Sequence, residues 1–373
     1  MTRSVIRPAV ASLTSKAVDP AWPRLAGLGT ATPALALDRD DTHDRLARLW
    51  GLSGSALDRW RRIVDGTGIE MRYGVLPPEQ IVGLSTEDRM KAYERLAPGL
   101  AEQAARAALD NAAVGIDRVT DLVVVSCTGF SAPGVDVALV RQLGLAPTVR
   151  RTMIGFMGCF GAIIGLRSAV GACAVDSRAV CLVVCVELCT LHLRPDPGAD
   201  NLVASALFGD GAAAAVVVGD RVGLSPAGAG DAAGIGRLTR GFGRLIPEGH
   251  DWMTWRVTDA GFAMTLDRCV PAALNAAVVE IVEEATGSDE GGPDCYVVHP
   301  GGPGILDAVS DGLTLAGGSG IEAARAILCR YGNMSSSAIL FVLDEMLRNR
   351  YRPPAMLLAF GPGLAVETIT LRP

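Results

Sequence analysis

The stretch GCFGAIIGLRSAVGACAVDSRAVCLVVCVE, residues 158–187, decides the class of fold. Residues 161–174 are small and apolar and predict a helix, and the Val-rich residues 179–187 predict a buried strand directly after it. The same pairing occurs upstream, where an Ala-rich helix at 100–113 is followed by the strand DLVVVS at 121–126. Val-rich strands between apolar helices are typical of a layered α/β core whose sheet is covered on both faces.

The second half of the chain repeats the pattern of the first. Helices are expected at 271–286 and 335–348, and each is followed by an apolar strand, at 294–298 and 355–360. The Gly- and Ala-rich residues 222–236 between the two series indicate a surface connection. The repetition predicts two pseudo-duplicated halves of one layered α/β core.

The chain divides, on this pattern, into a loose N-terminal arm at 1–22, a first half at 23–221 and a second half at 222–373. A length of 373 residues exceeds a single typical domain and fits two such units. Further strands are expected at 24–32, 211–219 and 365–371. A helix with acidic residues in its first turn is expected at 38–50.

Charge and hydropathy exclude several classes of function. A net charge of −6 argues against a protein that holds a nucleic-acid backbone by counterion release. Apolar runs such as 179–186 and 212–218 are far too short to cross a bilayer. Lys16 and Asp19 interrupt what would have to be the core of a signal peptide. We therefore expect a cytoplasmic protein without nucleic-acid or membrane partners.

The nine cysteines form no recognisable framework, and their odd number favours reduced thiols in the cytosol. Cys181, Cys185 and Cys189 recur every four residues, but the first two share one face of a Val-rich strand. We interpret all three as small core residues and predict no metal site. Lysine occurs only at positions 16 and 91, and neither follows a glycine-rich loop, which excludes a P-loop.

Three residues could carry acyl-transfer chemistry. Cys159 precedes an apolar helix, whose N-terminus is expected to lower the pKa of the thiol. His299 ends a strand and enters the turn HPGGPG, at the edge of a sheet where α/β proteins bind ligands. Asn333 precedes another helix. Each residue alone also has a structural reading, as a buried thiol, a loop histidine and a helix N-cap, but together they supply a nucleophile, an acid/base and an oxyanion donor.

The neighbouring motifs carry a resemblance that extends over roughly residues 24–373. In chain order they are QLGLAPTVRR with the Gly-Cys turn, SALFGDGAAA, MTWRVTDAGFAMTL, VVHPGGPGILD, RYGNMSSSAILFVLDEM and AFGPGL. This series resembles the chalcone- and stilbene-synthase-like type III polyketide synthases, in a bacterial-type form. The resemblance implies a thiolase-like layered fold (αβαβα), a homodimer, coenzyme A thioesters as substrates and no cofactor.

The resemblance also implies roles for the three residues. Cys159 would take the starter acyl group from an acyl-CoA and then carry the growing chain. His299 would hold the thiolate and, with Asn333, donate hydrogen bonds to the thioester oxygen of malonyl-CoA as CO2 leaves. Phe208, in LFGDG, matches a gatekeeping Phe beside the malonyl carboxylate.

The binding site for coenzyme A is implied less completely. Arg59 and Arg62, in DRWRR, match two of the family's three basic positions that meet the CoA phosphates, for which a guanidinium is well suited. The third position is Gly66, which weakens the expected CoA contact.

Several departures from the plant members concern the product. Met264 stands where plant members carry a second gatekeeping Phe, Trp255 replaces a small residue of the elongation cavity, and His192 replaces a Thr. The cavity is further expected to include Cys127, Thr128, Ala204 and Ser335. Because Trp255 reshapes the cavity and the flexible Met264 could admit an acyl tail, we expect a small aromatic or a pyrone as product.

Three alternatives compete with this reading. A single-round ketoacyl synthase of the fatty-acid initiation type shares the Cys-His-Asn set and would take malonyl from acyl carrier protein, but the GNMSS and FGPGL stretches disfavour it. A papain-like protease shares the order of the three residues and lacks the C-G-[SA]-C-[WY] signature. A silent acyl-CoA-binding protein would not need an intact triad.

Overall fold

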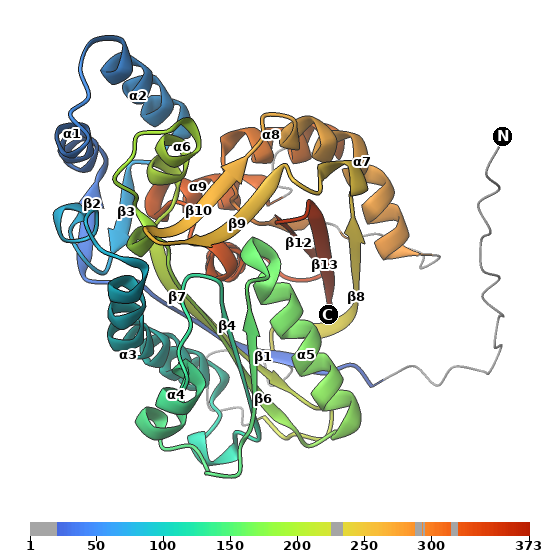
Figure 1. The fold of residues 1–373 in the computed structure, drawn as a ribbon. Helices are drawn as coiled ribbons and strands as arrows, with labels where there is room; N and C mark the ends of the chain where they lie inside the picture. The colour runs from blue at the N-terminus through green and yellow to red at the C-terminus, as the bar shows by residue number, and fades with distance from the viewer. Residues whose placement is uncertain (1–20, 225–233, 288–292, 294, 315–319) are drawn as a thin grey trace, which may run out of the picture.

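Two sets of strands meet in one nine-stranded sheet in the computed structural model, which describes residues 21–224, 234–287, 293, 295–314 and 320–373 (Figure 1). The N-terminal arm expected at 1–22 lies outside the described residues except for its last two positions. The expected connection at 222–236 also lies largely outside them.

The first set of strands runs in the order β1-β7-β6-β4-β5. Its members are β1 (Arg24–Ala31), β7 (Asp210–Val218), β6 (Val180–Leu188), β4 (Asp121–Ser126) and β5 (Arg150–Gly155). Strand β4 is parallel to β5 and β6, whereas β7 is antiparallel to both β6 and β1.

The second set repeats this pairing in the order β8-β13-β12-β11. Its members are β8 (Gly236–Leu245), β13 (Ala365–Arg372), β12 (Ala355–Gly361) and β11 (Tyr296–Val298). Strands β11 and β12 are parallel, and β13 is antiparallel to both β12 and β8. The two sets join only through the residue pairs Arg24↔Arg237 and Leu25↔Gly236.

The helices form layers inside and outside the two sets of strands. The helices are α1 (Arg39–Leu49), α2 (Gly54–Thr67), α3 (Thr86–Ala112), α4 (Val135–Leu143), α5 (Gly161–Val175), α6 (Ala199–Leu207), α7 (Val270–Thr286), α8 (Pro303–Gly312), α9 (Ile321–Tyr331) and α10 (Ala338–Arg348). Helices α5 and α10 contact strands of both sets and make the central layer. Helices α3 and α4 cover the outer side of the first set, and α7 and α8 lie outside the second. This order of layers is the αβαβα arrangement.

The strands of the first set are apolar on both faces because both faces are buried. Along β6, Cys181, Val183 and Cys185 point to the central layer, where they join the core around α5 and α10. Leu182 and Val184 alternate with them and join the core under α3 and α4. The reading of Cys181 and Cys185 as core residues is therefore confirmed.

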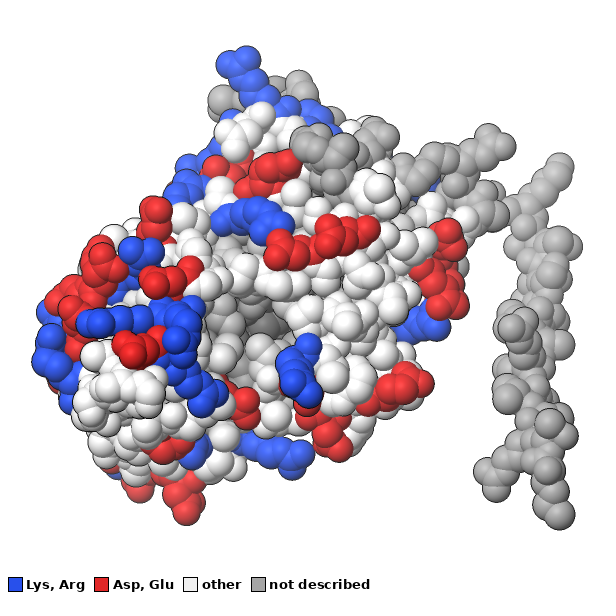
Figure 2. Space-filling view, turned by 90° about the horizontal axis from the view of Figure 1, so that it is seen from above, with Lys and Arg blue, Asp and Glu red and all other residues white. Residues whose placement is uncertain are grey.

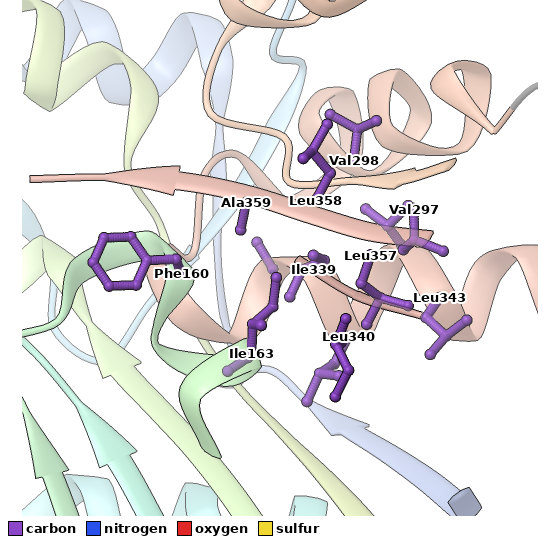
Figure 3. Close-up of a cluster of buried hydrophobic side chains, with 14 of the residues drawn as sticks. Phe160, Ile163, Val297, Val298, Ile339, Leu340, Leu343, Leu357, Leu358 and Ala359 are labelled. Carbon is purple, nitrogen blue, oxygen red and sulfur yellow. The ribbon is translucent and has the colours of Figure 1, made fainter. Parts of the chain in front are cut away.

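The central layer is closed by aliphatic side chains from both halves of the chain. Figure 3 shows Ile339 and Leu343 of α10 among side chains of β12, with Phe160 and Ile163 at the start of α5 nearby. Ile339 and Leu343 are completely buried. The central helices therefore hold the turns at their N-termini in fixed positions between the sheets.

Helix α5 with the turn before it, Gly158–Val175, is the one segment among the described residues that is long and apolar enough to cross a membrane by length and composition. Half of this window is buried inside the protein, between the two sets of strands. The core helix of a globular protein satisfies the same criterion, so the window is weak evidence for a membrane span.

Two predicted helices begin elsewhere than the sequence suggested. Helix α3 starts at Thr86, not at residue 100, because Ser85 caps it by accepting from the amide of Asp88 and because its buried face continues past Pro98. Helix α10 starts at Ala338, since residues Ser335–Ser337 form a separate 3₁₀ turn, η6.

Four short strands complete the fold as two hairpin-like pairs. Strand β2 (Leu35–Asp38) pairs with β3 (Met71–Gly74), and β9 (Met253–Thr258) pairs with β10 (Gly261–Leu266). Both pairs lie above the first set of strands in Figure 1, on either side of α6. These pairs and α6 form much of the wall of the candidate active site.

Candidate active site

A cavity of about 280 Å³ lies beside the turn that carries Cys159. In Figure 2 the surface is hollowed near the middle of the face shown, with basic and acidic side chains crowded on the side of α1 and α2. The structure brings Cys159 and all eight predicted gatekeeper and cavity residues together on the wall: Cys127, Thr128, His192, Ala204, Phe208, Trp255, Met264 and Ser335.

Cys159 lies in the 3₁₀ turn η3 (Gly158–Phe160), directly before α5. Gly158 has φ +75°, and a Cβ added there would lie 2.4 Å from Cδ of Pro362. Gly361, on the next segment, would likewise bring a Cβ to 3.4 Å from the amide nitrogen of Cys159. Small residues on both segments therefore let the AFGPGL loop pack directly on the turn of the thiol.

Burial dominates the titration of Cys159. It raises the pKa of the thiol to about 12, while hydrogen bonds with Ser335 and Asn333 act in the opposite direction. The Cys159 Sγ lies 3.9 Å from the Ser335 hydroxyl. The expected lowering of the pKa by the helix N-terminus is thus wrong for the thiol by itself, because desolvation is the larger effect.

His299 follows β11 and is held against β12 by its amide, which donates to the carbonyl of Leu358 at 2.9 Å. Its side chain is only 1% exposed, and burial lowers its pKa to about 3. Neither ring nitrogen has a hydrogen-bond partner among the described residues. Since buried polar atoms are normally paired, two unpartnered nitrogens mark a place for a ligand or a catalytic contact.

Asn333 is fixed on both its backbone and its side chain. Its amide donates to the carbonyl of Leu207 at 2.9 Å, and its carbonyl accepts from the amide of Gly209 at 3.0 Å. Its side-chain nitrogen donates to the carbonyl of Gly301 at 3.2 Å, and its side-chain oxygen accepts from the amide of Ser335 at 2.8 Å. Asn333 therefore lies one residue before the N-cap of η6, Met334, and its side chain accepts from the first amide of this turn. It also connects the loop after His299 to the loop of Phe208.

The three candidate catalytic residues converge from separate elements. The turn η3 with Cys159 packs against both β12 and η6, while His299 hydrogen-bonds to β12 and Asn333 precedes η6. Cys159 lines the cavity, whereas His299 and Asn333 are not part of its wall and are 1% and 2% exposed. Cys159 is therefore presented to the cavity, the Asn333 side chain acts on its thiol, and His299 is buried behind the wall on β12.

A buried carboxylate that the sequence analysis missed lies next to this group. Glu187 is fully buried at the end of β6 and accepts from the amide of Cys127 at 3.0 Å and from the hydroxyl of Thr128 at 2.8 Å. The Ser336 hydroxyl also donates to it. Burial raises the pKa of Glu187, and these hydrogen bonds oppose the rise. The only signal in the sequence was an acid at the end of an otherwise apolar strand.

The opposite wall of the cavity is aromatic. His192 stacks on Phe262 at 4.0 Å between ring centroids, and its Nδ1 accepts from the Phe262 amide at 3.1 Å. Its Nε2 then carries the proton and donates to the carbonyl of Thr128 at 2.7 Å. Burial lowers the pKa of His192 to about 3, so this neutral imidazole is a fixed part of the wall. The Trp255 indole also donates to the carbonyl of Cys127 at 2.7 Å.

The predicted CoA-binding arginines lie apart from the cavity wall. Arg59 and Arg62 are exposed on α2, as is Gly66 at the position where a third basic residue was expected. The wall instead includes polar residues that the sequence analysis missed, among them Arg72, Arg194, Asp196 and Asn201, and an apolar group made by Leu37, Leu46, Leu76, Ile81 and Leu193.

Two family models cover the chain: the N-terminal domain of chalcone and stilbene synthases matches residues 15–221, and the C-terminal domain matches residues 237–373. The chain belongs to the chalcone and stilbene synthase family. It is a type III polyketide synthase, an acyltransferase that builds polyketides by repeated condensation. The alternative of a single-round ketoacyl synthase is not favoured.

Two curated relatives of this type III polyketide synthase come from bacteria. A 1,3,6,8-tetrahydroxynaphthalene synthase from Streptomyces peucetius subsp. caesius is 32% identical over 356 residues, which is 93% of this chain and 92% of that protein. The alpha-pyrone synthesis polyketide synthase-like Pks18 of Mycobacterium tuberculosis is 30% identical over 364 residues, 92% of this chain and 89% of that protein. The prediction of a bacterial-type member is confirmed.

Solved structures of type III polyketide synthases share the fold. PKS-I from the brown alga Ectocarpus siliculosus superposes with a TM-score of 0.85 at 27% identity, covering 94% of this chain and 98% of that chain. The C-terminal type III polyketide synthase domain of Steely1 from Dictyostelium also gives a TM-score of 0.85, at 26% identity over 94% of this chain and 99% of that chain. The predicted thiolase-like layered fold is confirmed.

Proposed function

We propose that Cys159 is the nucleophile that carries the acyl chain. Its Sγ attacks the carbonyl carbon of a starter acyl-CoA after passing the thiol proton to His299. The new bond joins Sγ to the acyl carbon, the bond from that carbon to the sulfur of CoA breaks, and CoA leaves with the proton as the free thiol. The position of Cys159 on the cavity wall supports this role.

In the proposed second step, His299 and Asn333 stabilise the enolate of malonyl-CoA. The bond to the carboxylate carbon breaks, CO2 leaves, and the electron pair passes into the thioester, whose oxygen accepts hydrogen bonds from the imidazole and the amide. The enolate carbon then attacks the acyl carbon on Cys159, forming a carbon–carbon bond and releasing the thiolate. The chain, now longer by two carbons, is bound to CoA and returns to Cys159 for another round.

The observation that carries this proposal is the pair of unpartnered nitrogens on His299, in a group whose neighbours are otherwise hydrogen-bonded. Because burial holds His299 neutral, the ring offers one donor and one acceptor, as the two steps require. Decarboxylation itself supplies the carbon nucleophile, so the proposed reaction needs no metal or organic cofactor.

We propose malonyl-CoA as extender, an acyl-CoA as starter and a small aromatic or pyrone as product. Tetrahydroxynaphthalene and alpha-pyrones are the products named for two bacterial relatives. Trp255 narrows one side of the cavity, while the group with Leu37 and Leu46 makes another side apolar. We further propose that Arg59 and Arg62 meet the phosphates of CoA at the surface, with Phe208 and Met264 as gates.

We propose a homodimer whose interface includes strand β5. This strand is the edge of the nine-stranded sheet, and five of its six residues are exposed. Met153, Phe156 and Met157 are each at least 40% exposed, and Phe130 beside them is 52% exposed. An edge strand with exposed apolar side chains is a surface that a partner normally covers. A second copy of the chain would bury the same patch on both subunits.

We also propose that the enzyme acts in the cytoplasm. None of the nine cysteines, all within the described residues, forms a disulfide, and eight of them are buried or half-buried. Cys173 and Cys181 approach to 3.8 Å between sulfur atoms without being bonded, which fits a reducing compartment.

A product scan tests the proposed function. The purified protein is mixed with malonyl-CoA alone and with short, long and aromatic acyl-CoA starters, beside the variant Cys159→Ala, and products are analysed by mass spectrometry. Pyrones or polyhydroxylated aromatics that vanish in the variant support the proposal and name the starter. Products extended only once would contradict it, as would unchanged products from Cys159→Ala.

A further inference from the structure

A buried arginine that the mechanism above does not use lies under the loops of Phe208 and Asn333. Arg72, on β3, is 3% exposed and lines the cavity. One terminal nitrogen of its guanidinium donates to the carbonyl of Ser205 and, at 3.0 Å, to the carbonyl of Phe208. These carbonyls belong to the C-terminal end of α6, where carbonyls lack partners within the helix and a cation is favoured.

The segment that Arg72 holds is the one that pairs with Asn333. Phe208 forms a parallel bridge with Asn333, and the amide of Asn333 donates to the carbonyl of Leu207. The amide of Gly209 donates back to the carbonyl of Asn333. A single side chain therefore anchors the backbone of Phe208, which in turn anchors the backbone of Asn333.

The aliphatic part of Arg72 supports the Asn333 loop directly as well. Gly332 has φ +68°, and a Cβ added there would lie 2.9 Å from Cγ and 3.0 Å from Cδ of Arg72. A Cβ on Gly209 would lie 3.4 Å from the Cβ of Arg72. The glycines on either side of the Phe208–Asn333 bridge thus let both loops pack on this one side chain.

The charge of Arg72 is not used in an ion pair among the described residues. Asp210 is the nearest acid that acts on it, but this carboxylate accepts from the amides of Val75 and Thr190 and from the Thr190 hydroxyl. The second terminal nitrogen of Arg72 faces Nε2 of His43 at 3.3 Å. Burial lowers the pKa of Arg72 to about 10, so it remains charged at neutral pH. A buried guanidinium that donates hydrogen bonds to backbone carbonyls fixes the positions of those carbonyls strongly, because the hydrogen bonds are charge-assisted.

We propose that Arg72 is a positioning residue for decarboxylation: its hydrogen bonds to the Ser205 and Phe208 carbonyls set the place of the Phe208 ring and, through the bridge, of the Asn333 amide. This inference rests on the proposed function. Loading of Cys159 by the starter does not depend on Asn333 donating to the malonyl thioester, so Arg72 acts on the extension step selectively.

The test separates the two half-reactions in Arg72→Met and Arg72→Lys. Single-turnover acylation of Cys159 by an acyl-CoA is followed by mass spectrometry, and CO2 release from malonyl-CoA is followed without a starter. In Arg72→Met, kcat for CO2 release falls about 100-fold, the effect of displacing a reacting group by about 1 Å, while acylation of Cys159 changes less than about threefold. Arg72→Lys, which keeps the charge and can reach one carbonyl, recovers part of the lost kcat.

Arg89→Lys serves as the matched control for the loss of a buried guanidinium. Arg89 is fully buried and also donates to backbone carbonyls, those of Leu84 and Leu191, away from the Phe208–Asn333 bridge. Its variant is expected to lower the melting temperature and to leave the ratio of CO2 release to acylation unchanged. If Arg72→Met and Arg72→Lys change both half-reactions equally, or neither, Arg72 is merely structural and the inference is overturned.

If Arg72→Met fails to fold, Arg72→Lys still tests whether Arg72 acts selectively on CO2 release, because the lysine preserves the charge and most of the side-chain volume. Wild-type protein that releases no CO2 from malonyl-CoA would overturn the proposed function, and this inference with it. If the wild-type protein releases CO2 from malonyl-CoA and the Arg72 variants change both half-reactions equally, only the inference about Arg72 is overturned.

Discussion

At the scale of single residues, the site holds a thiol and an imidazole that are each neutral when considered separately. Burial raises the pKa of Cys159 to about 12 and lowers the pKa of His299 to about 3. In the proposed mechanism, reactivity at neutral pH comes from moving the proton from sulfur to nitrogen within the site, where the two opposite charges would stabilise each other.

His299→Ala tests this dependence of the thiol on the imidazole. Without the acceptor, a thiol with a pKa of about 12 is ionised to only about one part in 10⁵ at pH 7. We expect alkylation of Cys159 by iodoacetamide to be slow in the variant at pH 7 and to rise about tenfold per pH unit. In the wild type the rate should be higher and nearly independent of pH between 6 and 9.

Peptide mapping of the alkylated protein gives the rate at Cys159 itself. The cavity wall carries two further thiols, those of Cys127 and of Cys189, which the sequence analysis read as a core residue, and Cys127→Ser removes the first of them as a control. Equal alkylation rates for the wild type and His299→Ala at pH 7 would contradict the proposed proton transfer.

Trp255 determines the space available to the growing chain on the aromatic side of the cavity. Trp255→Ala enlarges the cavity, so we expect products with an additional extension or with bulkier starters. Its stability cost should stay below the roughly 3–5 kcal/mol of a fully buried tryptophan, because Trp255 is half-buried. Product profiles measured by mass spectrometry check this.

The matched variant Trp255→Phe removes the hydrogen bond to the Cys127 carbonyl and keeps most of the ring volume. If it changes the products as much as Trp255→Ala does, the hydrogen bond and not the volume controls the product.

At the scale of elements, strand β5 joins the catalytic cavity to the proposed dimer surface. Phe156, which follows this strand, lies 5.4 Å from Phe262 between ring centroids, and Phe262 lines the cavity. Phe130 stacks on the same ring at 6.1 Å. A subunit interface over this patch would therefore also fix one wall of the cavity.

Met153→Glu places a carboxylate on the exposed edge strand, and we expect it to shift the protein to monomers. Sedimentation should give about twice 38.7 kDa for the wild type and 38.7 kDa for the variant. Val279→Glu is the control, because Val279 on α7 is exposed to 42%, close to the 41% of Met153. A wild type that sediments as a monomer would contradict the homodimer.

Some helices and strands could be predicted from the sequence, and others could not. The strand at β4 followed from a run of Val, since both of its faces are buried, and the helix at α5 followed from its small and apolar residues, about half of which are buried. The start of α3 did not follow, because the prediction rested on the Ala-rich residues from 100 onward, whereas the helix begins at Thr86 and its buried face extends through Pro98.

The residues that the sequence pointed to as lining the cavity came from long motifs, and isolated residues of the same region were missed. Cys159 and the cavity residue Phe208 came from motifs of several residues, and the structure brings both to one wall. Arg72, in the short strand β3, and Glu187, near the end of the nine-residue strand β6, belong to no such motif. Only the fold reveals that one holds the Phe208 backbone and the other the Cys127 loop.

At the scale of the whole molecule, buried ionisable groups make stability depend on pH. Burial lowers the pKa of His43, His192 and His299 from 6.5 to about 3. The unfolded chain therefore binds more protons than the folded one between these values, and the stability that is present above pH 6.5 is lost as the pH falls. The buried acids Asp210 and Glu187 act in the opposite sense, because burial raises their pKa, that of Asp210 to about 6.

The three histidines together make the free energy of unfolding fall between pH 6.5 and pH 4.5, whereas Asp344 and Glu367 oppose this fall as Asp210 and Glu187 do, because burial raises their pKa as well. His192→Gln should lower the free energy of unfolding at pH 7. It should also reduce the slope of that free energy against pH by the contribution of one bound proton, roughly 1.4 kcal/mol per pH unit. Denaturant titrations at several pH values measure this slope. The same slope in His192→Gln and in the wild type would contradict the buried neutral histidine at position 192.

The most direct test of the account is to find the residue that carries the acyl chain. The wild type is incubated with an acyl-CoA starter, quenched, digested and analysed by mass spectrometry, and a second sample is chased with malonyl-CoA before quenching. The account predicts a starter adduct on Cys159 that malonyl-CoA converts to extended products. No adduct, or an adduct on Cys127 that is consumed while Cys159 stays free, would contradict it.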